Sequence, residues 1–211
     1  MTMRPKKRRR RCAEAPSIDR AFDELVPPEL RHLSQTHWTP VDIAVRAAGL
    51  LCPRPETRVL DVGAGIGKLC TVGALSEIGI WCGVEQHASL VRVAERIARQ
   101  LGVGGRTVFL HGDAFAIDWH EFDALYLYNP FEHALSSPGL AEGSVDGALQ
   151  AARVRDRLAM LRHGTRVVTL HGFGGVMPPS FTLVYHERVP VYGLDLVLWV
   201  QGPSRSAWGL S

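Results

Sequence analysis

Short apolar runs alternate with amphipathic stretches along most of the chain. The runs have the length of buried strands, and the stretches between them place apolar side chains three and four residues apart, as amphipathic helices do. This alternation predicts an α/β fold with helices packed on a mainly parallel sheet. The expected strands are residues 57–62, 80–85, 107–111, 122–128, 167–170, 181–186 and 194–200, and the expected helices are residues 41–51, 68–78, 89–101 and 148–161.

Two helix starts carry capping signals. Thr39 precedes the helix expected at residues 41–51, with Pro40 at its first position, and Ser89 begins the helix at 89–101. Serine and threonine hydroxyls accept hydrogen bonds from free N–H groups in a first turn, and proline has no N–H to satisfy. We therefore expect Thr39 and Ser89 to be N-caps.

A glycine-rich turn joins the first expected strand to its helix, and residues 57–68 read T-R-V-L-D-V-G-A-G-I-G-K. Glycines permit positive φ and close approach of a ligand, and the next helix offers unpaired N–H groups. The dinucleotide pattern G-x-G-x-x-G is not met, because Lys68 stands where its last glycine belongs. Asp61 would repel a pyrophosphate but suits an ammonium group. The turn therefore predicts a nucleotide-like ligand without phosphate.

A second landmark is Glu85, which ends the next strand 18 residues after Gly67. In nucleotide-binding α/β folds an acid at this place accepts hydrogen bonds from the ribose hydroxyls. Two carboxylate oxygens match two vicinal hydroxyls. The alternative interpretation is an exposed loop acid.

The glycine turn, read as V-L-D-V-G-A-G-I-G, resembles motif I of the class I S-adenosylmethionine-dependent methyltransferases. The resemblance covers roughly residues 36–200. It implies a three-layer α/β sandwich with a mostly parallel seven-stranded sheet whose last strand is antiparallel. It also implies that Asp113, after the third strand, binds the adenine amino group; the alternative is an Asx turn. The implied S-adenosyl-L-methionine contacts are Thr39, Asp61, Gly63, Ala64, Gly65, Gly67, Glu85, Gln86, Asp113, Ala114 and Asn129.

The fourth strand leads into Asn129, Pro130 and Phe131, which the resemblance places beside the transferable methyl group. Methyltransferases acting on amino nitrogens often carry (Asp/Asn)-Pro-Pro-(Tyr/Phe/Trp) here, and this sequence is one proline short. We expect these three residues to be catalytic, with Asn129 accepting hydrogen bonds from an amine and Phe131 stacking on the substrate. The alternative is a turn with a packed aromatic ring.

Other residues are weaker candidates for the same region. The resemblance suggests that the segment 36–40, with Trp38, lies over the cofactor, against the alternative of plain helix capping. His171 follows the fifth strand and is the best imidazole candidate near the methyl group, although a structural histidine is the simpler interpretation. Phe173 is expected to add an apolar wall. No residue is assigned as general base.

Composition fixes the class of protein. The chain has 211 residues, 46% apolar and 21% charged, as in a soluble globular domain. Residues 1–11 hold seven basic side chains and no acid, so the net charge of +3 conceals a remainder with 17 basic and 21 acidic residues. We expect a basic disordered tail at 1–16, a helical cap at 17–56 and the cofactor-binding domain at 57–211.

Several function classes are disfavoured. No segment is apolar enough to span a membrane or to form a secretory signal, so a cytoplasmic location is expected. No metal site is expected, since Cys12, Cys52, Cys70 and Cys82 show neither C-x-x-C spacing nor a nearby pair of histidines. The four thiols are interpreted as buried apolar groups.

The acceptor is expected to be an amine of a protein or small molecule. Three alternatives stay open: an NAD-dependent oxidoreductase, disfavoured by Asp61 and Lys68; a protein that binds S-adenosylmethionine without catalysis; and a nucleic-acid methyltransferase tethered by the basic tail. The negative charge outside the tail counts against the last. The sequence assigns no oligomeric state.

Overall fold

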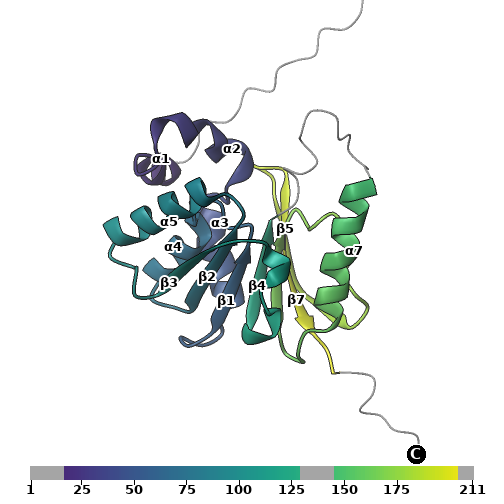
Figure 1. Cartoon of the computed structure of the whole chain (residues 1–211). Coiled ribbons are helices and arrows are strands. Elements are labelled where there is room, and N and C mark those ends of the chain that lie inside the picture. The colour runs from purple at the N-terminus through teal and green to yellow at the C-terminus, as the bar shows by residue number, and fades with distance from the viewer. Residues whose placement is uncertain (1–16, 129–144, 204–211) are drawn as a thin grey trace, which may run out of the picture.

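A single sheet of seven strands forms the centre of the computed structural model, which describes residues 17–128 and 145–203. The strand order is β3-β2-β1-β4-β5-β7-β6, and β7 runs antiparallel to its two neighbours. The predicted α/β sandwich is thereby confirmed (Figure 1). The strands are β1 (Arg58–Val62), β2 (Ile80–Glu85), β3 (Thr107–His111), β4 (Ala124–Tyr128), β5 (Arg166–Leu170), β6 (Phe181–Val189) and β7 (Leu194–Gln201).

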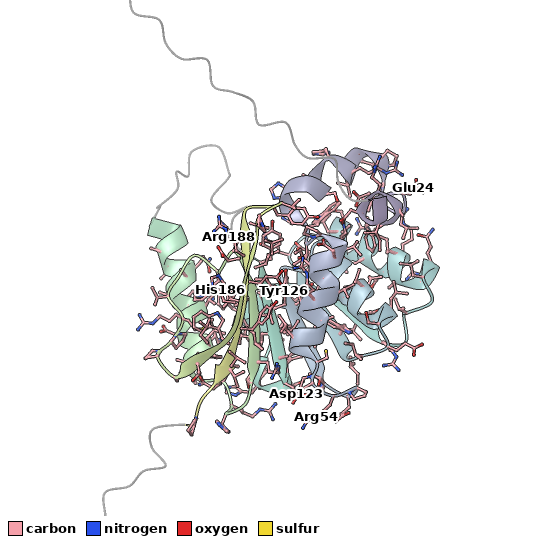
Figure 2. All side chains as sticks on the ribbon, turned by 180° about the vertical axis from the view of Figure 1, so that it is seen from behind. Glu24, Arg54, Asp123, Tyr126, His186 and Arg188 are labelled. Atoms are coloured by element: carbon pink, nitrogen blue, oxygen red, sulfur yellow. The ribbon has the colours of Figure 1, made fainter. Side chains whose placement is uncertain are left out.

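The strand order sets where a ligand can bind. Strand β1 pairs in parallel with both β2 and β4: the chain adds β2 and β3 on one side of β1 and then crosses to add β4 on the other side. The crevice beyond the carboxyl ends of such strands is the usual ligand site of an open α/β sheet. Two labelled residues mark the two ends of the strands in Figure 2. Glu24 lies in the segment above the carboxyl ends, and Asp123, which precedes β4, lies at the opposite end.

Helices cover the two faces of the sheet unequally. Helices α3 (Val41–Leu51), α4 (Lys68–Leu75) and α5 (Ala88–Gln100) lie on one face, and α7 (Val145–Ala159) lies on the other (Figure 1). Two short 3₁₀ helices, η2 (Ala114–Ala116) and η3 (Trp119–Glu121), pack on the α7 side.

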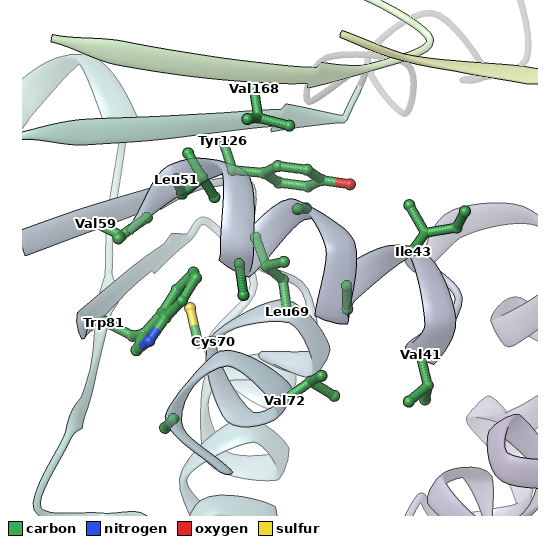
Figure 3. Packing of buried hydrophobic residues seen from close by; sticks show 14 of the residues in the cluster. Val41, Ile43, Leu51, Val59, Leu69, Cys70, Val72, Trp81, Tyr126 and Val168 are labelled. Carbon is green, nitrogen blue, oxygen red and sulfur yellow. The ribbon is translucent and has the colours of Figure 1, made fainter. Parts of the chain in front are cut away.

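Alternation along each strand produces two separate cores. In β1, Val59 faces α3 and α4, whereas Leu60 faces α7. Figure 3 shows the first core, where Trp81 and Tyr126 pack among aliphatic side chains of α3 and α4. Both aromatic side chains are almost fully buried. The sheet is therefore fixed from both faces, and its carboxyl edge is a rigid platform.

The remaining N-terminal elements form a small cap. It comprises α1 (Ser17–Asp23), the 3₁₀ helix η1 (Pro28–Leu33) and α2 (Ser34–His37). Figure 1 shows α1 and α2 above the carboxyl edge of β1 and β2. Of the expected cap at 17–56, only this part lies above the sheet, because α3 belongs to the helical layer.

Both predicted N-caps are wrong. The capping residue of α3 is Pro40, and its first N–H, on Val41, donates to Asp19 Oδ1 at 3.0 Å. The capping residue of α5 is His87, and no side chain caps that helix. At α3 a tertiary contact replaced the local cap, since Asp19 reaches this helix from 22 residues away.

Candidate functional site

The glycine turn after β1 is held against the neighbouring strand. The N–H groups of Gly63 and Ala64 both donate to the carbonyl of Val84 at 3.0 Å. All three glycines have positive φ, between 55° and 76°. At Gly67 (φ 69°) a Cβ atom would lie 2.4 Å from the Phe109 ring, so a side chain has no room there. The turn is thus a preformed cradle of backbone atoms.

Glu85 braces this turn. Its Oε2 accepts a hydrogen bond from the N–H of Gly65 at 3.0 Å, and its Oε1 accepts one from His87 N at 2.9 Å. The side chain is 8% exposed. Each oxygen of a carboxylate accepts two hydrogen bonds, so both keep one lone pair for a ligand hydroxyl. Gln86, next in the chain, is exposed at the same edge.

Asp61 is a buried acid below the turn. It lies opposite Tyr126 in the β1–β4 register, and the thiol of Cys70 donates to its Oδ2 at 3.5 Å. Burial raises the pKa of the Asp61 carboxyl to about 7; the Cys70 hydrogen bond opposes this increase, and the charge of Glu85 adds to it. A nearby ammonium group would favour the ionised form, as expected for a ligand carrying one.

Trp38 and Thr39 connect the N-terminal cap to the site. A Cβ atom on Gly65 would lie 3.3 Å from the indole Nε1 of Trp38, so the indole rests on the turn. The Thr39 hydroxyl lies 2.8 Å from the hydroxyl of Tyr126. This bond engages the Thr39 side chain instead of helix capping, and it ties the segment to β4. A ligand contact by Thr39 stays a prediction.

The loop after β3 belongs to the same edge. The N–H of Gly112 donates to the carbonyl of Glu85 at 3.0 Å. Asp113 Oδ1 accepts from Phe115 N at 2.9 Å, which is the Asx turn considered above. Within the described residues neither Asp113 Oδ2 nor the N–H of Ala114 has a hydrogen-bond partner. An acceptor beside a donor matches the amino group and ring nitrogen of adenine.

The end of β4 is described as far as Tyr128, so Asn129, Pro130 and Phe131 lie outside the described residues. His171 follows β5 with φ 60° and is exposed. Its backbone N–H donates to the carbonyl of Asp195 at 3.0 Å. Phe173 is 3% exposed and packs in the core beside α7. A role for Phe173 as an apolar wall of the acceptor site stays a prediction.

Sequence reasoning missed the role of two residues. The Lys68 ammonium is 2% exposed and contacts Asp19 Oδ1 at 2.6 Å and Asp23 Oδ1 at 3.4 Å, fastening the cap to the start of α4. Gly83 lies inside β2, where a Cβ atom would come within 2.7 Å of the Ala64 methyl. An isolated glycine in a strand is a signal of such close approach. No sequence signal pointed to the partners of Lys68.

The thiols divide by burial. Cys52 and Cys70 are buried, as expected, and burial raises the pKa of the Cys52 thiol to about 12. Cys82 is half-buried, and Cys12 lies outside the described residues. In residues 17–128 and 145–203, no three His, Cys, Asp or Glu side chains are grouped to hold a metal ion. None of the helices in these ranges has the length and apolar character needed to cross a bilayer.

Comparison with known proteins gives the fold. A crystal structure of an RNA methyltransferase from Salinibacter ruber with S-adenosyl-L-homocysteine is similar at a TM-score of 0.58 and 20% identity, over 78% of this chain and 91% of that one. MtNAS, a mutant of which was solved with S-adenosylmethionine, matches at a TM-score of 0.57 and 17% identity, over 88% and 72%. The [4+2]-cyclase SpnF matches at 0.58 and 14%, over 78% and 82%.

Comparison of sequences detects less similarity than comparison of structures. No model of a known protein family matches the chain. The uncharacterized protein YjhP of Escherichia coli K12 is 34% identical over 61 residues, which is 29% of this chain and 25% of that protein. The chain thus has the class I S-adenosylmethionine-dependent methyltransferase fold, and structural relatives bind S-adenosylmethionine or S-adenosylhomocysteine. Because a cyclase shares this fold, the fold alone does not assign the reaction.

Proposed function

We propose that the protein is an S-adenosylmethionine-dependent methyltransferase acting on an amine nitrogen of a protein or small molecule. One observation carries the cofactor assignment. Groups suited to each part of this ligand lie on three adjacent strands at one edge: the glycine turn and Asp61 on β1, Glu85 on β2, and Asp113 after β3.

The groups at this edge fit the cofactor chemically. Glu85 retains a lone pair on each oxygen for the ribose hydroxyls, and Asp113 Oδ2 with Ala114 N–H matches the adenine edge. Asp61 suits the ammonium of the amino-acid end. Gly63, Ala64, Gly65 and Gly67 leave the backbone open to approach. A pyrophosphate would meet Asp61, and Lys68 replaces the last glycine of the dinucleotide pattern, which together disfavour NAD.

Methyl transfer requires little of the protein beyond alignment of the two reactants. When bound, S-adenosylmethionine supplies an electrophilic methyl group on a sulfonium, which is a good leaving group. The protein must hold the acceptor nitrogen in line and exclude water. Asn129 is placed by sequence directly after β4, where its side-chain oxygen would accept a hydrogen bond from the acceptor amine. A neutral amine is required, and the aromatic ring of Phe131 would favour it by lowering the local polarity.

Calorimetric titration tests this proposal. Wild-type protein is titrated with S-adenosylmethionine, S-adenosylhomocysteine and NAD, and the series is repeated on Glu85→Ala. We expect micromolar binding of the first two ligands and at least a tenfold loss in the variant, since a buried carboxylate bonded to a hydroxyl contributes about 1.5–3 kcal/mol. Binding of NAD alone would refute the proposal.

Catalysis is tested separately from binding. Asn129→Ala should retain S-adenosylhomocysteine binding and lose methyl transfer to an accepted substrate. Methyl transfer that persists in this variant would show that Asn129 is not required for catalysis. If neither the wild type nor the variant transfers a methyl group above background in any acceptor screen, the result would favour a protein that binds the cofactor without catalysis.

A nucleic-acid acceptor is the second candidate, and the seven basic residues among positions 1–11 favour it. Phosphate contacts make binding steeply dependent on salt. Binding of single- and double-stranded RNA and DNA is therefore compared between 50 and 200 mM salt, with and without residues 1–16. A steep slope that disappears on truncation would support this candidate, and equal weak binding of both forms would exclude it.

A further inference from the structure

The loop that would bind adenine is held in place by contacts with Trp119, which follows it in the chain. Trp119 Nε1 donates to the carbonyl of Ala114 at 2.9 Å, and the Trp119 ring stacks on Phe115 with 6.1 Å between centroids and 15° between planes. Both rings are buried. Phe115 therefore anchors the loop in the core, while Asp113 remains exposed at the edge of the sheet.

A second set of contacts reaches the loop from α7, about 40 residues further along the chain. Arg157 donates from Nη2 to the carbonyl of Phe115 at 2.5 Å and from Nη1 to the carbonyl of Ile117 at 3.2 Å. Arg153, one turn earlier, places its guanidinium carbon 3.8 Å from the centre of the Phe115 ring. The two arginines thus hold both the backbone and the anchoring ring of one short loop.

The chemistry of arginine suits this task. The guanidinium is planar, permanently charged and presents several N–H groups in a rigid fork, so one side chain spans two carbonyl oxygens. A lysine ammonium at the same place would reach one carbonyl at a time. Because Phe115 is two residues from Asp113 and one from Ala114, fixing its carbonyl fixes the peptide groups that carry the free acceptor and donor.

We propose that Arg157, supported by Arg153, is a positioning residue for adenine recognition: it holds the loop 113–117 so that Asp113 Oδ2 and the Ala114 N–H face the base together. This inference rests on the proposed function.

The test is selectivity between two ligands. S-Inosylhomocysteine differs from S-adenosylhomocysteine in carrying an oxo group for the amino group and N1–H for the N1 acceptor, so both contacts are mismatched. Calorimetry with both ligands is carried out on the wild type and on Arg157→Ala, Arg157→Lys and Arg153→Met. Arg155→Ala is the control, because Arg155 is exposed on α7 and makes no hydrogen bond or ion pair among the described residues.

We expect the wild type to prefer the adenine ligand at least tenfold. Arg157→Ala should weaken the adenine ligand about tenfold and the inosine ligand less than threefold, since only the former uses the positioned pair. Arg157→Lys should resemble Arg157→Ala, Arg153→Met should show a smaller loss in the same direction, and Arg155→Ala should equal the wild type.

Several outcomes would overturn the inference. Equal weakening of both ligands in Arg157→Ala would mean that the arginines only support folding. Unchanged binding of both ligands would show that the arginines take no part in recognition. In both cases wild-type binding of S-adenosylhomocysteine leaves the proposed function intact. Absence of wild-type binding to either ligand would instead overturn the proposed function and the inference with it. If Arg157→Ala does not fold, Arg157→Lys and Arg153→Met carry the same comparison.

Discussion

The Lys68 ammonium lies 2.6 Å from Oδ1 of Asp19, and both side chains are almost completely buried. Lys68 opens α4 directly after the glycine turn, whereas Asp19 belongs to the N-terminal cap and also accepts the first N–H of α3. One buried carboxylate therefore joins α1, α3 and α4. The segment carrying Trp38 is held over the turn by this junction and by the bond between Thr39 and Tyr126.

Removing the ammonium should destabilise the protein strongly. Lys68→Ala leaves Asp19 and Asp23 buried or half-buried without their partner, and we expect a loss of about 3–5 kcal/mol in the free energy of unfolding. Urea denaturation measures this loss. Arg54→Ala is the control, since the Arg54–Glu56 pair is about two-thirds exposed and should contribute less than about 1 kcal/mol. Similar losses in the two variants would contradict the buried junction.

The close packing of the glycine turn predicts a second stability effect. In Gly67→Ala the new methyl would collide with Phe109 and Ala94 at a positive φ, so we expect a loss of about 2–5 kcal/mol from strain and overpacking. Gly104→Ala is the matched control, because its Cβ would enter open space. That substitution should change stability by less than about 1 kcal/mol. Thermal melting of both variants gives the comparison, and a stable Gly67→Ala protein would refute the packing argument.

Asp61 predicts how stability depends on pH. Its folded pKa is about 7, above the value near 3.9 in an unfolded chain, so the folded state binds more protons between these values. Stability is then greatest at the acid end and falls as pH rises from about 4 to 7, by up to about 1.4 kcal/mol per pH unit from this group. Urea titrations at several pH values measure the slope.

Asp61→Asn should flatten the dependence in this window. Asp195→Asn is the control, because a hydrogen bond from His186 holds the pKa of the Asp195 carboxyl below its usual value and its effect falls at lower pH. A wild-type profile that rises between pH 4 and 7, or an unchanged slope in Asp61→Asn, would show that Asp61 is already ionised in the folded state.

The indole of Trp38 should report ligand binding. It rests on Gly65 and is 7% exposed, so a ligand entering the turn must change its surroundings. We expect S-adenosylhomocysteine to shift or quench tryptophan fluorescence, and Trp38→Phe to abolish most of that change. Trp81→Phe serves as the control, since Trp81 is buried in the core against Gly73 of α4. A fluorescence change of the same size in Trp38→Phe would show that the ligand does not alter the surroundings of the Trp38 indole.

The sequence by itself determined the strands and the chemistry at their ends. Strands β2 and β3 have the predicted bounds, because runs such as Ile80–Glu85 combine apolar and β-branched residues and end at a charged group. The spacing of the glycine turn, Glu85 and Asp113 was sufficient to predict a common ligand edge, since parallel strands bring their carboxyl ends together. These features are local, so a single chain displays them.

The tertiary structure decided which distant groups share a hydrogen bond. Thr39 had the sequence of an N-cap, yet its hydroxyl contacts Tyr126, 87 residues away, and Asp19 caps α3 instead. Phe173 follows β5 in a glycine-rich segment, and only the fold shows that its ring packs among the buried residues beside α7. The carboxylate partners of Lys68 and the carbonyl partners of Arg157 lie 40 to 49 residues away in the chain. Polar groups take whichever partner the packed fold brings within 3 Å, and that choice depends on the arrangement of whole elements, which local sequence does not encode.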